Sequence, residues 1–341
     1  MAKPKPKRPQ QEAIAASALP YTETEVSFKN PKAPGVTLAG TLTTPQGKGP
    51  FPTILLLASQ GKQTRDEVVA GHKIFLVLRD HLTREGYAVL SYDKRGVGAS
   101  TGDFAAATLN EFASDAEAAI AFLRTRPDLN QKRMGLIGHS EGGAVAPMVL
   151  TQTKGLAFAV LMAGPMVRGE ELMNDQSLTM ARVNGAPEAS LLAIQAHEMR
   201  INAAVARSTS VEDARAKVRA ILTEPGAQPT TAEELEENIS WYASPWMRVF
   251  LNHEPEAYLK KVSIPLLGIF GDKDVHLGLE ANTTAFIDSQ KHNPKAKVIV
   301  LKGHNHLFQR ASTGGPREYG KIEETLSPEF LQTLTEWLKS Q

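Results

Sequence analysis

The stretch Met134-Gly135-Leu136-Ile137-Gly138-His139-Ser140-Glu141-Gly142-Gly143 decides the fold of this 341-residue chain. A short apolar run leads directly into a Gly-x-Ser-x-Gly pattern, and the residues after it can begin a helix. A serine on a tight turn between a strand and a helix, flanked by glycines, presents its hydroxyl at the carboxyl end of the strand. The stretch therefore predicts a strand, a sharp turn and a helix, with Ser140 as a candidate nucleophile.

A second copy of the same pattern, Gly98-Ala99-Ser100-Thr101-Gly102, lies earlier in the chain. Ser100 stands several residues beyond the nearest apolar run, in a glycine-rich loop that no strand abuts. Because the chemistry requires the serine directly at the end of a strand, the context favours Ser140 over Ser100.

Apolar runs recur along the chain between helical stretches, which predicts an α/β fold. Unbroken apolar strands are typical of a mostly parallel sheet covered by helices on both faces, since neither face of such a strand meets water. Residues 22–29 and 36–44 add a predicted hairpin across a Lys-Ala-Pro-Gly turn. The predicted core strands are 53–58, 87–92, 134–138, 157–162, 266–270 and 297–301.

Residues 166–262 contain no comparable strand and are far longer than an ordinary crossover. We therefore expect a helical lid inserted between strands 6 and 7 of the sheet. The predicted division is a leader at 1–20, a core at 21–165 and 263–341, and the lid at 166–262.

Two features within the expected lid concern packing. Apolar residues of 191–205 cover more than half of a helical circumference, which predicts burial on two sides. A second segment concentrates aromatic and sulfur side chains, and two interpretations stay open for it: packing in a hinge or core, or the lining of an acyl pocket. Its members are Trp241, Tyr242, Trp246, Met247 and Phe250.

Composition and charge exclude several classes of function. The chain has 38 Lys and Arg against 37 Asp and Glu, a net charge of +1, so no strong field holds nucleic acid or an anionic membrane. There are no cysteines, which excludes disulfides, cysteine nucleophiles and thiolate zinc sites. No apolar run approaches the roughly 18 residues of a membrane span. The basic, proline-rich start is no intact signal peptide, and we expect a disordered leader left where a signal was replaced.

A serine hydroxyl needs a neighbouring imidazole to take its proton, and a carboxylate to orient that imidazole. The strand at 266–270 is followed by Gly271-Asp272-Lys273-Asp274, and the strand at 297–301 by Gly303-His304-Asn305-His306. The order Ser, Asp, His suits this architecture.

Each of these loops offers two candidates. We favour Asp274, because the acid must lie one turn beyond the end of the strand to point toward the histidine loop. We expect Asp272 to stabilise that turn through its own hydrogen bonds. His306 is favoured over His304, because Leu307 and Phe308 can anchor its loop. A metal site on the two histidines is disfavoured since no third ligand cluster is evident, so we expect neither metal nor cofactor.

Attack on a carbonyl creates an oxyanion that backbone N–H groups can stabilise. One predicted donor is the N–H of Glu141 at the start of the helix, where the helix dipole adds to it. The other is the N–H of Gln60, in the loop Ser59-Gln60-Gly61 after the strand at 53–58. The carboxylate of Glu141 is expected to be solvated or paired at the helix N-terminus.

These motifs together resemble the α/β-hydrolase superfamily, and the similarity spans residues 22–339. They are similar in particular to the bacterial lid-bearing carboxylesterases, a group also described as dipeptidyl-aminopeptidase/acylaminoacyl-peptidase-related hydrolases. The resemblance implies a serine-triad esterase on short acyl esters, with a helical lid and no cofactor. Members are frequently exported, so we expect a periplasmic or extracellular enzyme, and otherwise a cytoplasmic one. The motifs are Gly138-His139-Ser140-Glu141-Gly142-Gly143, Tyr92-Asp93-Lys94-Arg95-Gly96-Val97-Gly98 and Asn305-His306-Leu307-Phe308-Gln309.

The chain departs from that group in the loop Ser59-Gln60-Gly61-Lys62, where the family usually has glycine, serine, glycine, proline. A side chain in place of the first glycine can narrow the acyl site or shift the oxyanion donor. His276 and Gly278 are also unusual for the group.

Three hypotheses for the function follow, and each carries its own requirement. A carboxylesterase would cleave a small-molecule ester through an acyl-enzyme on Ser140. A serine aminopeptidase would need an acidic group in the lid for a free amine, and Glu198, Glu236 or Glu237 are available. A non-catalytic binding protein could retain the scaffold alone. The oligomeric state stays open between monomer and homodimer.

Overall fold

The computed structural model describes residues 6–227 and 230–341 and is built around one large sheet. Its strand order is β1-β2-β6-β3-β7-β8-β9-β10, and β4 and β5 pair in a separate two-stranded sheet. β2 runs antiparallel to β1 and β6, whereas β6, β3, β7, β8, β9 and β10 run parallel to one another. The strands are β1 (Tyr21–Lys29), β2 (Thr37–Pro45), β3 (Phe51–Leu57), β4 (Val68–Val69), β5 (His72–Lys73), β6 (Ala88–Tyr92), β7 (Leu129–His139), β8 (Phe158–Met162), β9 (Leu266–Gly271) and β10 (Ala296–Leu301).

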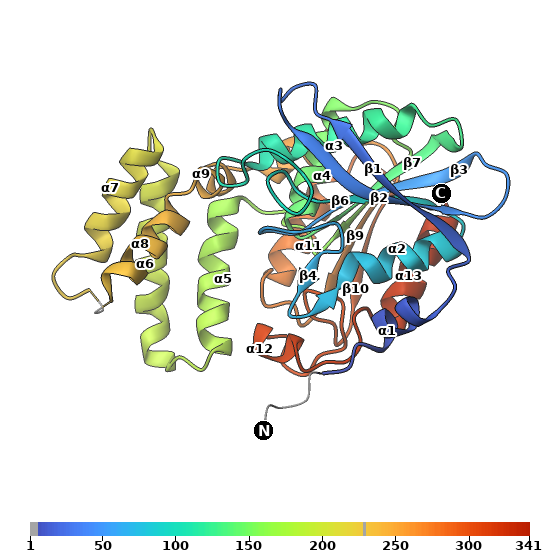
Figure 1. Cartoon of the computed structure of the whole chain (residues 1–341). Helices are drawn as coiled ribbons and strands as arrows, with labels where there is room; N and C mark the ends of the chain where they lie inside the picture. Colours follow the sequence, from blue (N-terminus) through green and yellow to red (C-terminus); the bar gives the residue numbers. More distant parts are fainter. Residues whose placement is uncertain (1–5, 228–229) are drawn as a thin grey trace.

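Helices cover both faces of this sheet, as the unbroken apolar strands predicted (Figure 1). α2 (Ile74–Arg84) packs with α13 (Pro328–Lys339), and α3 (Leu109–Arg124) packs with α4 (Glu141–Gln152). α11 (Leu279–Ser289) lies against β9 and β10. Every residue of β6, β8 and β9 is buried, because neither face of these strands meets water. The expected α/β fold and the expected hairpin at the start of the sheet are confirmed.

A run of helices separates β8 from β9, the sixth and seventh strands of the large sheet in chain order. The longer ones project to one side of the sheet and pack around a small apolar core of their own (Figure 1). That the segment acts as a lid stays a prediction. Its helices are α5 (Gly169–Val183), α6 (Glu188–Ala206), α7 (Val211–Leu222), α8 (Ala232–Tyr242), α9 (Pro245–Leu251) and α10 (Pro255–Leu259).

The expectation that the apolar arc of 191–205 is buried on two sides is wrong. Leu191, Ile201 and Val205 are buried, but Leu192 is 76% exposed and Met199 is 47% exposed. α6 contacts α5, α7, α8 and α9, and these helices leave part of its apolar surface uncovered. Sequence periodicity counts apolar residues but does not show which of them a neighbouring element covers.

The expected disordered leader is also wrong for the residues that the structure describes. Residues of the leader form helix α1 (Pro9–Ala16), while residues 1–5 lie outside the described part. The guanidinium of Arg8 donates to the carbonyls of Ala70, Gly320 and Ile322, at 3.0 to 3.1 Å. Gln10 exchanges hydrogen bonds with the backbone near residue 325. Most of these contacts join residues that are more than 300 positions apart in the sequence. The composition of the leader therefore did not indicate them.

The loop after β10 is anchored by aromatic stacking on the C-terminal helix. Phe308 and Phe330 are both fully buried, and their ring centroids are 4.4 Å apart. Ser327, the N-cap of α13, also donates its backbone N–H to the Phe308 carbonyl at 3.0 Å. This packing fixes the segment that carries the two loop histidines, and the short helix α12 (Pro316–Tyr319) follows it in the chain.

Replacing Phe330 by Ala should lower the free energy of unfolding by about 3–5 kcal/mol, because a buried aromatic ring is lost and a cavity remains. Phe330→Leu should cost less, since it keeps most of the apolar contact. Urea unfolding of the two variants checks this, and equal stability of the Ala variant and the parent chain would contradict the anchoring role.

Candidate active site

Ser140 occupies a strained turn between β7 and α4, as the sequence predicted. Its backbone has φ 52° and ψ −114°, a conformation that is unfavourable for a residue with a side chain. A Cβ on Gly138 would lie 2.1 Å from the Gly142 carbonyl oxygen, and one on Gly142 would lie 2.0 Å from the Leu57 carbonyl oxygen. Only glycine permits this close approach of strand and helix, so the pattern is explained by packing at the turn.

Asp274 and His306 lie together, each in the loop after its own parallel strand. His306 Nδ1 is 2.7 Å from Asp274 Oδ2, and Asp274 Oδ1 accepts the backbone N–H groups of His276 and Leu277. Burial acts to raise the pKa of Asp274, but the His306 imidazole and these hydrogen bonds outweigh it and lower the pKa. The carboxylate thus stays ionised and holds Nδ1, which leaves Nε2 of His306 as the nitrogen for a proton transfer.

Ser140 and His306 line one cavity of about 240 Å³, which also borders the loop after β3. The core supplies one wall and the inserted helices supply the other, including Leu172, Met173 and Gln176 of α5 and Trp246 and Phe250 of α9. The strand ends therefore bring the candidate nucleophile and the imidazole to one space, and the inserted segment lines one side of it.

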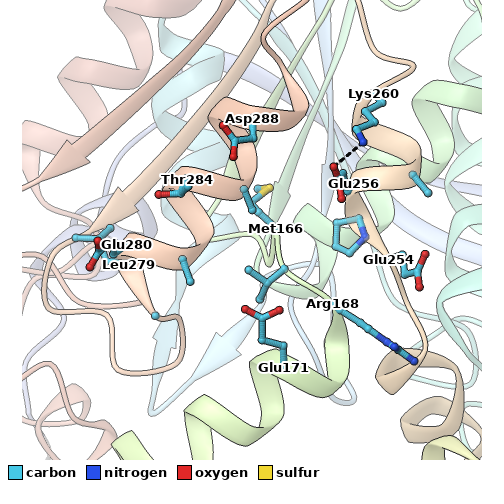
Figure 2. A pocket seen from close by; sticks show the side chains of 16 residues that line it. Met166, Arg168, Glu171, Glu254, Glu256, Lys260, Leu279, Glu280, Thr284 and Asp288 are labelled. Atoms are coloured by element: carbon cyan, nitrogen blue, oxygen red, sulfur yellow. Dashed lines mark ion pairs between the residues drawn. The ribbon is translucent and has the colours of Figure 1, made fainter.

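A larger cavity of about 1150 Å³ lies elsewhere, between α10, α11 and the start of α5 (Figure 2). Its lining is rich in carboxylates, with Glu254, Glu256 and Asp288 among them, and Glu256 pairs with Lys260 at 2.6 Å. Neither Ser140 nor His306 borders it. The smaller cavity is therefore the candidate active site.

The competing residues of the sequence patterns have structural roles. Ser100 is buried, donates its hydroxyl to the Asp93 carbonyl at 2.7 Å and accepts the Ala39 N–H at 2.9 Å. Asp272 accepts the Gly303 N–H at 2.6 Å, which serves the turn as expected. His304 is fully buried between the Lys302 carbonyl and the Ser327 hydroxyl.

The two predicted oxyanion donors both border the candidate active site. Glu141 begins helix α4, and the first N–H groups of a helix lack acceptors within it. Lys94 Nζ donates to the Ser59 carbonyl at 2.6 Å, while the Ser59 N–H donates to Glu67 at 2.9 Å. Because C=O and N–H point in opposite directions in a trans peptide, the bond from Lys94 fixes the orientation of the Gln60 N–H. The serine that replaces the usual glycine is buried in this arrangement.

The carboxylate of Glu141 is buried, so the solvated alternative is wrong and the paired one is right. It accepts hydrogen bonds from Lys94 Nζ and from the indole N–H of Trp246. Lys94 lies in the loop after β6 and Trp246 in α9, far from Glu141 in sequence. One side chain at the helix start thus ties the core to the inserted helices.

A buried ion pair beside the candidate active site was missed by the sequence reasoning. His139 Nδ1 is 2.7 Å from Glu67 Oε1, and its Nε2 is 2.9 Å from the backbone carbonyl of His306. A backbone carbonyl and an ionised carboxylate can only accept hydrogen bonds, so both ring nitrogens of His139 donate when Glu67 is ionised. Burial acts to lower the pKa of His139, but the Glu67 carboxylate outweighs it and raises the pKa. Glu67 itself has φ 48°. Both the Gly-His-Ser motif and the stretch Arg65-Asp66-Glu67 resemble the family, but neither indicated that Glu67 and His139 meet.

His276, which the sequence left unexplained, packs on the candidate base. Its ring centroid is 4.6 Å from that of His306, and its Nδ1 is 2.8 Å from Gln176 Nε2 of α5. Burial, with the neighbouring His306, lowers the pKa of His276 to about 4, so it stays neutral near pH 7. Gly278 is the N-cap of α11, a position at which glycine is favoured, and its carbonyl accepts the Asn282 N–H at 3.0 Å.

Across residues 6–227 and 230–341, no group of three or more His, Asp or Glu side chains is arranged to hold a metal ion. Within the same residues, no helix is long and apolar enough to cross a membrane.

Glu67→Gln should lower the free energy of unfolding by about 2 kcal/mol, because it removes the charge that the His139 imidazolium requires. Because the pKa of His139 is higher in the folded chain than its ordinary value of 6.5, protonation of this histidine stabilises the fold. This stabilisation is fully present below pH 6.5 and is lost as the pH rises through the folded-state pKa. The difference between parent and variant should therefore be larger at pH 6 than at pH 9, as measured by urea unfolding.

Glu256→Gln is the matched control, because its carboxylate pairs with Lys260 on the surface of α10. Such exposed pairs contribute about 0.5 kcal/mol, so this variant should unfold almost as the parent does. A Glu67→Gln variant that behaves like this control would contradict the buried ion pair.

The chain is similar in sequence to proteins named as esterases. The Thermotoga maritima protein named Esterase EstD is 26% identical over 272 residues, which cover 80% of this chain and 58% of that protein. The Yersinia enterocolitica protein named Esterase FrsA is 40% identical over 88 residues, or 26% of this chain and 19% of the relative. The chain thus spans little more than half the length of the first relative and about a fifth of the second.

Solved structures with the same fold include the Pyrococcus furiosus esterase Pf2001, with a TM-score of 0.59 at 16% identity, covering 100% of this chain and 99% of that one. The α/β hydrolase GrgF from a Penicillium species has a TM-score of 0.57 at 18% identity, covering 94% and 98%. The pattern of the X-Pro dipeptidyl-peptidase family (S15) matches residues 34–307, most of the chain. The chain belongs to the S15 X-Pro dipeptidyl-peptidase family and has the α/β-hydrolase fold.

Proposed function

We propose that the chain is a serine carboxylesterase that forms an acyl-enzyme on Ser140. The observation that carries the proposal is that His306, which is bonded to Asp274, lines the same cavity as the strained Ser140. Relatives named as esterases support the type of bond cleaved. A serine, an imidazole and a carboxylate in this order are the groups that acyl transfer requires.

In the proposed reaction, His306 alternately accepts and donates a proton. Ser140 Oγ attacks the ester carbonyl carbon while His306 Nε2 takes its proton, and Asp274 stabilises the imidazolium. The oxyanion accepts hydrogen bonds from the backbone N–H groups of Gln60 and Glu141. The intermediate then collapses, His306 protonates the departing alcohol, and the acyl group remains on Ser140. Water attacks next with His306 as base, which releases the acid and restores the serine.

The proposed substrates are small-molecule esters with a short acyl group. The cavity at Ser140 measures about 240 Å³, and large side chains such as Trp246, Phe250 and Leu172 border it. A space of this size beside rigid aromatic rings suits an acetyl or propionyl group better than a long chain.

A peptidase is the second candidate, because the family name describes removal of dipeptides. Recognition of a free amine would require an unpaired carboxylate in the site. Glu198 bonds to the Tyr242 hydroxyl, Glu236 pairs with Arg215 and Arg219, and none of the three lid glutamates borders the Ser140 cavity. Glu141 is the one carboxylate in the described lining, and it is already paired. These contacts favour the ester.

Ser140→Ala should abolish hydrolysis of p-nitrophenyl acetate, with a loss of about 10⁴-fold or more in kcat. Ser100→Ala is the matched control from the second Gly-x-Ser-x-Gly pattern, and it should keep turnover although it loses one buried and one partly buried hydrogen bond. A fluorophosphonate should label the parent chain and the Ser100→Ala variant, and it should not label the Ser140→Ala variant. Undiminished turnover in the Ser140 variant would overturn the proposal, and an unlabelled parent chain without turnover would favour a binding protein.

The ester and peptide candidates are separated by assaying one preparation on two substrates. We expect kcat/KM for p-nitrophenyl acetate to exceed that for an aminoacyl-prolyl p-nitroanilide by more than about 100-fold, since no carboxylate is placed for the amine. A preference for the anilide would instead support the peptidase.

A further inference from the structure

A second cavity lies next to the candidate active site, on the other side of Trp246. It measures about 390 Å³ and is lined mainly by apolar groups of the inserted helices and of the loop after β6, among them Phe104, Ala107 and Trp241. Gln60, Glu141 and Trp246 border both cavities. These three residues therefore form the partition between Ser140 and the second space.

Trp246 is the largest part of this partition, and its position is fixed on several sides. Its ring stacks on Phe250 at 4.6 Å between centroids and on Trp241 at 6.0 Å. Phe250 borders only the cavity with Ser140, and Trp241 borders only the second one. The indole N–H donates to the buried carboxylate of Glu141, which Lys94 holds in turn. The indole thus stands between the two spaces and is held by a charged group.

The position of the partition identifies which part of an ester it would meet. His306 protonates the departing alcohol in the proposed reaction, so the alcohol lies on the side of the imidazole. The acyl chain points away from the imidazole, past the donors of the oxyanion site. The second cavity borders Gln60 and Glu141 but not His306 or His276. It therefore lies on the acyl side.

We infer that the cavity behind Trp246 is a latent acyl-chain site, and that the indole of Trp246 closes it and restricts the enzyme to short acyl groups. This inference rests on the proposed esterase function and adds the acyl specificity and the residue that sets it. With the indole removed, an acyl chain of medium length can extend from Ser140 into an apolar space, where its methylene groups leave water.

The test is the ratio of kcat/KM for p-nitrophenyl octanoate to that for p-nitrophenyl acetate, which share one leaving group. Trp246→Ala should raise the ratio by about tenfold or more, because a pocket discriminates each added methylene by roughly this factor. Trp246→Phe should leave the ratio near that of the parent, since it keeps an aromatic wall without the N–H donor. Trp246→Leu should give an intermediate ratio and serves if the Ala variant does not fold.

Trp241→Ala is the matched control, because this ring belongs to the same stack but does not border the Ser140 cavity. Its ratio should equal that of the parent. Adding Ala105→Phe, at an exposed position on the cavity lining, to Trp246→Ala should reverse the gain.

An unchanged ratio in Trp246→Ala, with acetate turnover and fluorophosphonate labelling intact, would overturn the inference and leave the proposed function standing. A parent chain that hydrolyses neither ester would overturn both, and the failure of labelling would identify that case.

Discussion

The buried pair of Glu67 and His139 joins the segments on which the candidate site depends. Glu67 accepts the N–H of Ser59 in the loop after β3, and His139 reaches the carbonyl of His306 in the loop after β10. His139 itself is the residue before Ser140. A single ion pair thus connects the candidate oxyanion loop, nucleophile and base. Burying two charges is unfavourable unless they are paired and hydrogen-bonded, so the arrangement holds only while all partners are in place.

Lys94 and Glu141 form a second connection of the same kind. Lys94 bonds to the Ser59 carbonyl and to the Glu141 carboxylate, so one ammonium group orients the residues whose N–H groups are the two proposed oxyanion donors. The other oxygen of Glu141 holds the indole of Trp246. The inserted helices are therefore linked to the start of α4 by charge and not only by apolar contact. A helix start that carries a buried, paired carboxylate is rigid, which suits a site that must be preorganised.

His276 and Gln176 connect the inserted segment to the other side of the site. Gln176 of α5 bonds to His276, and the His276 ring packs against His306. Since burial keeps His276 neutral near pH 7, it adds no positive charge beside the imidazole that the proposed reaction protonates. The inserted helices thus contact both ends of the candidate site, at Trp246 and at His276.

The sequence by itself determined the α/β class, the strands and the residues Ser140, Asp274 and His306 as candidates, because unbroken apolar runs, glycines at a tight turn and loops at strand ends are local signals. It did not predict the ordered helix α1, since Arg8 bonds to carbonyls near residues 70 and 320. Nor did it predict the exposure of Leu192, the partners of Glu141 or the role of Glu67. Each of these depends on which distant segments meet, and only tertiary packing places a carboxylate beside an imidazole 72 residues away.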